Sequence, residues 1–192
     1  AAVTGAAAGT AASMSAMIGG VAVTSTTNLS VTPGAIDASK SAVSIVGGST
    51  TLTSAASATI KLQAKDTFGN NLTSGGATVT FTKSGGTSAF TQSFPLAATD
   101  HSDGTYTATI TGSAAGTAAT LGAKIGTTTV SSTVDLSVVN GTISTATSVV
   151  SIVGGASSVA SGSSVTVKLQ AKDAAGNNLT DGGATVTFTD RK

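Results

Sequence analysis

Short stretches of alternating apolar and polar residues run along the whole chain and predict β-strands. In residues 58–66, Ile60, Leu62 and Ala64 share one face, and lysine and glutamine side chains occupy the other. The same alternation occurs in residues 78–82, 105–110 and 121–125. Successive side chains of a strand point to opposite faces, so each stretch predicts one buried and one wet face. No segment has apolar residues at helical spacing over two turns, which predicts an all-β fold.

This pattern recurs along the chain at a constant offset of 107, so that position 34 corresponds to position 141. Residues 34–85 align with residues 141–192 without a gap, and 31 of the 52 positions are identical. The blocks KLQAKD (61–66), GNNLT (69–73) and GGATVTFT (75–82) each return at the same offset. Self-similarity at one fixed period is the sequence signature of a repeat architecture.

The repeat divides the chain into three parts. Residues 1–33 align with residues 108–140 and form the C-terminal part of a repeat, residues 34–140 form a complete repeat, and residues 141–192 form the N-terminal part of the next. The turn-forming sequences VTPG and VVNG lie at the two boundaries. About seven short strands per period, separated by glycine, asparagine, aspartate and serine turns, fit a two-sheet sandwich. The sequence therefore predicts tandem immunoglobulin-like β-sandwich repeats with a period of 107 positions.

The amino-acid composition limits the classes of partner that the chain can bind. Only 9% of the residues are charged, against about 25% in an average domain, and the net charge is +1. Without a run of like charges there is no electrostatic basis for binding nucleic acid or a membrane surface. Residues 1–23 are too rich in glycine, serine and threonine to be a membrane span. Aromatic residues make up 3% of the chain, which disfavours a lectin-like, ligand-binding module.

The only histidine, His101, lies in a TDHSDG loop beside Asp100 and Asp103. A metal site would need a second histidine or a cysteine, and the chain has neither. A serine nucleophile would need a base and an orienting acid, and one loop histidine does not supply a triad. We therefore expect a solvated turn at His101, no catalytic, cofactor-binding or metal-binding residues, and no enzymatic activity.

A second candidate is the turn that follows KLQAKD. Its oxygen-bearing side chains could bind calcium near a domain boundary, in which case calcium would be the only cofactor. The alternative is that aspartate ends a strand and the Gly-Asn pair forms the turn. One aspartate per loop is few for a calcium site, so the turn is the favoured interpretation. The residues concerned are Asp66, Asn70 and Asn71, and one period later Asp173, Asn177 and Asn178.

Tyr106 follows Asp103-Gly104 near the start of a predicted strand, an arrangement similar to the tyrosine corner of Greek-key sandwiches. We expect its ring in the core and its hydroxyl group in a hydrogen bond.

Two blocks give the chain a resemblance to a known family. The first is AKDxxGNNLTxGGATVTFT, at 64–82 and 171–189, and the second is SDGTYTATITGSAAGTAATLGAKI, at 102–125. With these blocks the chain resembles the bacterial immunoglobulin-like (Big) domains of the invasin and intimin type, which form tandem repeats in surface adhesins. The resemblance implies an extracellular, cell-surface location and a structural stalk whose partners are neighbouring repeats. Host or cell-surface receptors would then be bound by other domains.

Two functions remain as hypotheses. The first is a non-catalytic spacer of a surface adhesin or fibre. The alternative is a self-assembling filament or sheath subunit, in which residues 1–33 complete residues 141–192 of another chain by strand exchange. Residues 1–33 and 141–192 together match positions 108–140 and 34–85 of the complete repeat, so counterparts of residues 86–107, several of them apolar, are missing. This shortfall favours a piece of a longer array.

Overall fold

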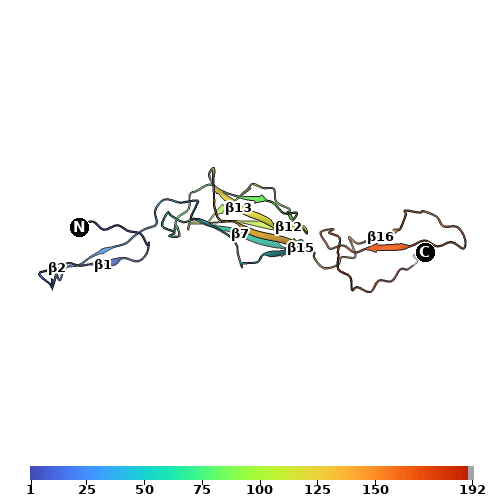
Figure 1. The fold of residues 1–192 in the computed structure, drawn as a ribbon, viewed down its shortest axis with the longest axis horizontal. Helices are drawn as coiled ribbons and strands as arrows, with labels where there is room; N and C mark the ends of the chain where they lie inside the picture. Colours follow the sequence, from blue (N-terminus) through green and yellow to red (C-terminus); the bar gives the residue numbers. More distant parts are fainter. Residues whose placement is uncertain (190–192) are drawn as a thin grey trace.

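The computed structural model describes residues 1–189, in which every regular element is a strand. Three parts follow one another along an elongated molecule (Figure 1). An N-terminal segment, residues 1–33, lies at one end, a sandwich formed by residues 34–140 lies in the middle, and a C-terminal segment, residues 141–189, lies at the other end. In the described part of the chain, no helix has the length and apolarity needed to cross a membrane.

The sandwich contains eleven strands. They are β5 (Ala42–Ile45), β6 (Thr51–Thr53), β7 (Ser57–Gln63), β8 (Val79–Ser84), β9 (Ala89–Phe90), β10 (Leu96–Ala97), β11 (Thr99–Asp100), β12 (Thr105–Ala114), β13 (Ala119–Ile125), β14 (Thr128–Thr129) and β15 (Val134–Val139).

These strands form two sheets. One has the order β11-β12-β7-β5, with β9 also paired to β12, and the other has the order β10-β8-β13-β15-β6, with β14 paired to β13. All pairs are antiparallel except β15 with β6. The longest ladders join β12 to β7 and β13 to β8, so the first half of the sandwich pairs with its second half. Two face-packed sheets of this kind confirm the all-β, immunoglobulin-like prediction.

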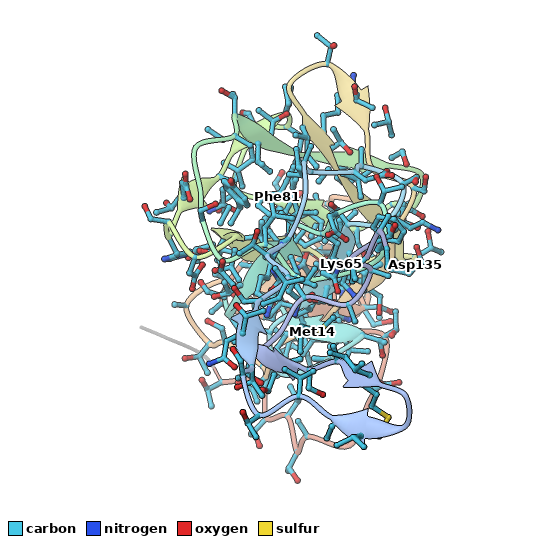
Figure 2. All side chains as sticks on the ribbon, turned by 90° about the vertical axis from the view of Figure 1, so that its left-hand side faces the viewer. Met14, Lys65, Phe81 and Asp135 are labelled. Carbon is cyan, nitrogen blue, oxygen red and sulfur yellow. The ribbon has the colours of Figure 1, made fainter. Side chains whose placement is uncertain are left out.

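The core lies between the two sheets and follows the predicted alternation. Ile60, Leu62 and Phe81 have no exposed surface, and the threonines and lysines between the core positions lie at least partly in water. Phe81 lies among the side chains of the sandwich in the view along the long axis (Figure 2). The core is completed by Val43, Ile45, Leu52, Ala64, Val79, Tyr106, Ile110, Leu121, Ala123, Val130 and Leu136.

Tyr106 lies in the core as predicted, and its hydroxyl oxygen accepts a hydrogen bond from the backbone N–H of Ala77 at 3.1 Å. Ser88 is buried as well, where it donates to the carbonyl of Gly116 and accepts from the N–H of Val138. Among the described residues, no buried side-chain polar atom lacks a partner. The polar groups inside the sandwich therefore stabilise the loops that join the strands.

The two end segments contain short strands with mostly exposed side chains. In the N-terminal segment these are β1 (Ala12–Met14), β2 (Met17–Ile18), β3 (Val21–Ala22) and β4 (Thr27–Leu29), paired β1 with β4 and β2 with β3. In the C-terminal segment β16 (Val149–Ile152) pairs with β17 (Val167–Gln170).

Candidate functional site at the segment junctions

In the turn after β7, the carboxylate of Asp66 accepts hydrogen bonds from the backbone of the turn itself. The carboxylate of Asp66 accepts the backbone N–H groups of Phe68 at 3.0 Å and of Asn70 at 2.9 Å on Oδ1. Its other oxygen, Oδ2, accepts the N–H of Gly34 and the side-chain amide of Asn70, both at 2.9 Å. Gly69 has a φ of 84°, a conformation that favours glycine. The turn therefore ties the linker residue Gly34 to the sandwich.

Asn70 extends this turn to the N-terminal segment. Its side-chain Nδ2 donates to the carbonyl of Ala6 at 2.7 Å, and its Oδ1 accepts the N–H of Ala8 at 2.9 Å. One side-chain amide thus makes a two-point contact with the main chain of the preceding segment. We call the set formed by Gly34, Asp66 and Asn70 the first junction clasp.

The same arrangement occurs at the other end of the sandwich, one period later. Asp173 accepts the N–H of Gly141 at 3.0 Å, and Asn177 donates to the carbonyl of Ser113 at 3.1 Å and accepts the N–H of Ala115 at 3.3 Å. We call Gly141, Asp173 and Asn177 the second junction clasp. Its three residues are the counterparts of Gly34, Asp66 and Asn70, one period later. The residues that Asn177 contacts, Ser113 and Ala115, are likewise the counterparts of Ala6 and Ala8.

The second clasp includes one further donor. Ser54, in the sandwich, donates its hydroxyl to Oδ2 of Asp173 at 2.5 Å, and both residues are buried. This hydrogen bond joins a side chain of the sandwich to a side chain of the C-terminal segment. The second junction is therefore held by side-chain and main-chain contacts together.

The hydrogen bonds keep both aspartates ionised. The amide of Asn70, followed by the backbone N–H of Gly34, lowers the pKa of Asp66 from 3.8 to about 2. Burial raises the pKa of Asp173, but hydrogen bonds from Ser54, Asn177 and Gly141 outweigh this effect and leave the pKa below its ordinary value. Each clasp is thus built around a carboxylate whose charge is balanced by N–H and O–H dipoles.

This geometry matches the turn interpretation of the Asp-Asn motifs. Every hydrogen bond to the two carboxylates comes from an N–H or O–H group, so the positive ends of the donors converge where a cation would need oxygen ligands. Asn71 and Asn178 are exposed, and their side chains take no part in the clasps. In residues 1–189 no three histidine, cysteine or acidic side chains form a group that could hold a metal.

The loop around His101 is a hydrogen-bonded turn. Asp100 accepts the N–H of Gly76 at 2.6 Å and that of Ser102 at 2.8 Å. The ring Nε2 of His101 lies 2.7 Å from the hydroxyl of Thr107, and the residue is exposed. These contacts are those of the solvated turn that we expected at this position.

The sequence did not indicate the contact between segments. The aspartates and asparagines of the clasps were singled out, but as a turn or as a calcium site near a domain boundary, with no hydrogen bond to the preceding segment. The partners of Asn70 are main-chain atoms of Ala6 and Ala8, and main-chain atoms carry no sequence signature. The available signal was the return of Gly34, Asp66 and Asn70 one period later, whereas Thr67 and Phe68 between them change to alanine.

Comparison with known proteins identifies the family to which this domain belongs. The two-sheet sandwich defines the chain as an immunoglobulin-like domain. Its sequence matches the family described as invasin, domain 3, over residues 37–141, so the chain belongs to the invasin domain 3 family. No curated protein sequence matches the chain.

Solved structures of bacterial surface proteins share the fold. The structure of invasin, a bacterial integrin-binding protein, matches with a TM-score of 0.52 and 24% identity over 86% of this chain and 32% of its own. InvD of Yersinia pseudotuberculosis matches with a TM-score of 0.50 and 24% identity over 90% of this chain. The adhesin FdeC of Escherichia coli matches with a TM-score of 0.50 and 22% identity over 86% of this chain. The matches span 52% of the InvD and FdeC chains, so this chain corresponds to about half of their length.

Family membership gives the general class of the protein. The chain is a non-enzymatic, immunoglobulin-like domain of the invasin type, a family of adhesin domains exposed on the outside of the cell. This agrees with the resemblance found in the sequence and with the expectation of a non-enzymatic protein.

Proposed function

We propose that this chain is a spacer in the stalk of a surface adhesin, in which immunoglobulin-like repeats are joined end to end by junction clasps. In this proposal residues 34–140 are one complete repeat, and residues 1–33 and 141–192 belong to its two neighbours. The observation that carries the proposal is the recurrence of the same intersegment hydrogen bonds at both ends of the sandwich. A junction that recurs in this way adds length in a constant direction with each repeat.

Close packing beside each clasp holds the start of each linker against the repeat that precedes it. A Cβ at Gly5 would lie 2.8 Å from the side chain of Val31, and a Cβ at Gly112 would lie 3.0 Å from that of Val138. These two pairs are again counterparts, one period apart. Since only glycine allows so close an approach, the strand that leads into each linker packs directly against its own repeat.

Receptor binding in the longer adhesin is assigned to other domains. One protein of similar fold is named as integrin-binding, and its chain is about three times longer than the part that matches. The present chain has few charges and few aromatic residues, the groups that dominate binding hot spots. The alternative hypothesis, strand exchange between chains, concerns the apolar faces of the end segments and is independent of the clasps.

Distance measurements between two spin labels across the first junction test the spacer proposal. The chain has no native cysteine, so Thr10 and Thr127, which are both exposed, can be replaced by cysteine and labelled. We expect a narrow distance distribution in this parent protein, because the clasp fixes the N-terminal segment on the sandwich. Asn70→Ala removes both intersegment hydrogen bonds and should broaden the distribution.

Asn71→Ala is the matched control, because Asn71 is the adjacent asparagine, is exposed and has no side-chain role in the clasp. It should leave the distribution unchanged. A parent distribution as broad as that of the Asn70→Ala variant would mean that the junction is a free hinge, and the spacer proposal would then be wrong.

A further inference from the structure

The first and last strands of the sandwich lie on the line between its two linkers. The linker at Gly34 leads into β5 and then β6, and β15 leads directly into the linker at Gly141. Tension in a stalk of joined repeats passes through these linkers, because they are the covalent connections. β7 and β15 run along the long axis of the molecule, and β5 and β6 pair with them (Figure 1). Tension therefore acts along these strands and not across them.

The pair formed by β6 and β15 is parallel, and this decides how it is loaded. Its register joins Thr51 to Ser137 and Thr53 to Val139. Tension reaches β6 at its first residue, Thr51, and β15 at its last residue, Val139. In a parallel pair these residues lie at opposite ends of the ladder, so the two strands are drawn past each other in opposite directions. All hydrogen bonds of the ladder are then loaded at once, whereas strands pulled apart from one end lose their bonds one after another.

Hydrogen bonds and a core contact hold β6 on β15. The N–H of Ser54, just after β6, donates to the carbonyl of Val139 at 2.9 Å. The carbonyl of Thr50, just before β6, accepts the N–H of Ser137 at 3.0 Å. Between these two bonds Leu52 is buried in the core, opposite a buried valine of β15. The strand is thus fixed at both ends and in the middle.

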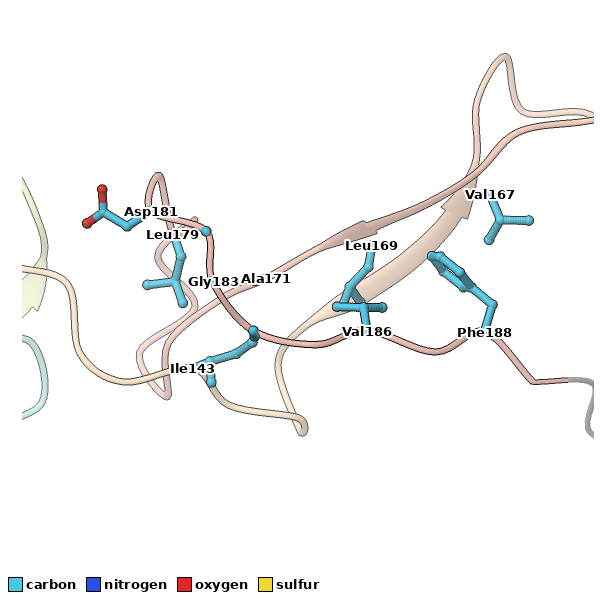
Figure 3. Close-up of a pocket in the computed structure, with 11 residues that line it drawn as sticks. Ile143, Val167, Leu169, Ala171, Leu179, Asp181, Gly183, Val186 and Phe188 are labelled. Carbon is cyan, nitrogen blue, oxygen red and sulfur yellow. The ribbon is translucent and has the colours of Figure 1, made fainter.

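The C-terminal segment contains the same first strands without a counterpart of β15 beside them. Its β16 and β17 pair as β5 and β7 do, but residues 158–160, the counterparts of β6, form no strand, and Val159 has 50% of its surface exposed. Leu169 and Phe188, whose counterparts in the sandwich are buried, line an open groove (Figure 3). In the proposed array the rest of that repeat closes this groove. The comparison indicates that pairing with β15 holds β6 in place.

We propose, on the basis of the spacer function above, that the β6–β15 pair is a mechanical clamp, a parallel ladder loaded in shear that keeps the repeat folded under tension. β5 precedes β6 on the path of the tension, so its release from β7 leaves the clamp intact. Separation of β6 from β15 then removes Leu52 from the core and unfolds the repeat. The force that the sandwich withstands depends on the barrier to unfolding, and hence on the direction of pulling, more than on the free energy of unfolding.

Force spectroscopy of the whole chain in two pulling directions tests the clamp. The chain has no native cysteine, so DNA handles can be attached to pairs of introduced cysteines. Thr32→Cys with Thr142→Cys pulls the sandwich from its two linkers. Thr50→Cys with Thr133→Cys pulls from residues just before β6 and β15, at the same end of the ladder, and peels the two strands apart. All four threonines are exposed.

At the same loading rate we expect the sandwich to unfold at a several-fold higher force when it is pulled from its linkers than when it is peeled. Equal unfolding forces in the two directions would overturn the proposal. The spacer proposal has a separate test in the spin-label distances, which depend on the junction and not on how the sandwich unfolds. A stiff junction with equal unfolding forces would therefore refute the clamp alone.

A matched pair of leucine truncations tests whether β6 carries the load. Leu52 and Leu96 lie in β6 and β10, the two edge strands of one sheet, and both pack in or against the core. Thermal melts check that both alanine variants fold. Leu52→Ala should lower the force needed to unfold the sandwich from its linkers, whereas Leu96→Ala, away from the path of the tension, should lower it much less. An equal or larger loss of force in Leu96→Ala would refute the clamp; if Leu52→Ala does not fold, the two pulling directions decide.

Discussion

Removal of the Asn70 side chain should loosen the N-terminal segment without unfolding the sandwich. The side chain makes two hydrogen bonds to that segment, one to the carbonyl of Ala6 and one from the N–H of Ala8. A net contribution of about 0.5–1.5 kcal/mol each gives about 1–3 kcal/mol for the pair. In Asn70→Ala we therefore expect the amide of Ala8 to exchange with solvent about 5-fold to 150-fold faster, since about 1.4 kcal/mol is a factor of ten.

Amide hydrogen exchange followed by NMR measures this change at single residues, and the molecule contains its own control. Ala115 has the same role at the second junction, where its N–H donates to Asn177. Its exchange should not change in Asn70→Ala. The N–H of Gly34 donates to Asp66 and reports on whether the turn itself is intact. If Ala8 exchanged at the parent rate while Gly34 stayed protected, the hydrogen bonds of Asn70 would not hold the segment.

Three further predictions concern pH, the core and the turns. Folding lowers the pKa of Asp66 from 3.8 to about 2, so its ionised form stabilises the native state fully above about pH 4. This stabilisation is lost as the pH falls through about 2. Thermal melts should show the loss as a falling melting temperature, and Asp66→Asn should make the melting temperature less dependent on pH in this range. Tyr106→Phe removes the acceptor of a part-buried backbone N–H and should lower the free energy of unfolding by about 1 kcal/mol in urea titrations, with the slope unchanged. Gly104→Ala places a methyl group against the carbonyl of Leu72, whereas the methyl group of Gly126→Ala meets open space, and both glycines have a positive φ. Gly104→Ala should therefore lower the melting temperature clearly more than Gly126→Ala.

The strands and the core were predictable because one physical signal determines both. A strand with one buried face must alternate, and the alternation in residues 58–66 was enough to identify Ile60 and Leu62 as core residues. Tyr106 was predictable for a related reason, since a large ring with one polar atom fits the core only where a backbone group can reach it.

The contact partners of the clasps could not be predicted in the same way. Asp66 stood out as a residue that ends a strand, but an aspartate followed by Gly-Asn forms a turn in many contexts. What distinguishes this turn is the position of Ala6 and Ala8, which depends on how the preceding segment leaves its own strands. Local pattern contains no information about that arrangement, which is why the sequence predicted a turn at Asn70 but not its contact with the preceding segment.

The asparagine of each clasp binds main-chain atoms of the preceding segment through its own side chain, and this asymmetry helps to explain how a junction can recur. The carbonyl bound by Asn70 belongs to an alanine, and the one bound by Asn177 belongs to a serine, yet the hydrogen bonds are the same. Main-chain atoms are present whatever the side chain, so the positions that the asparagine contacts are free to vary in sequence. The following segment must keep the aspartate and asparagine of the turn, because their side chains supply defined donors and acceptors. A repeat that keeps this aspartate and asparagine can therefore bind the same main-chain atoms in any preceding repeat whose backbone takes the same course.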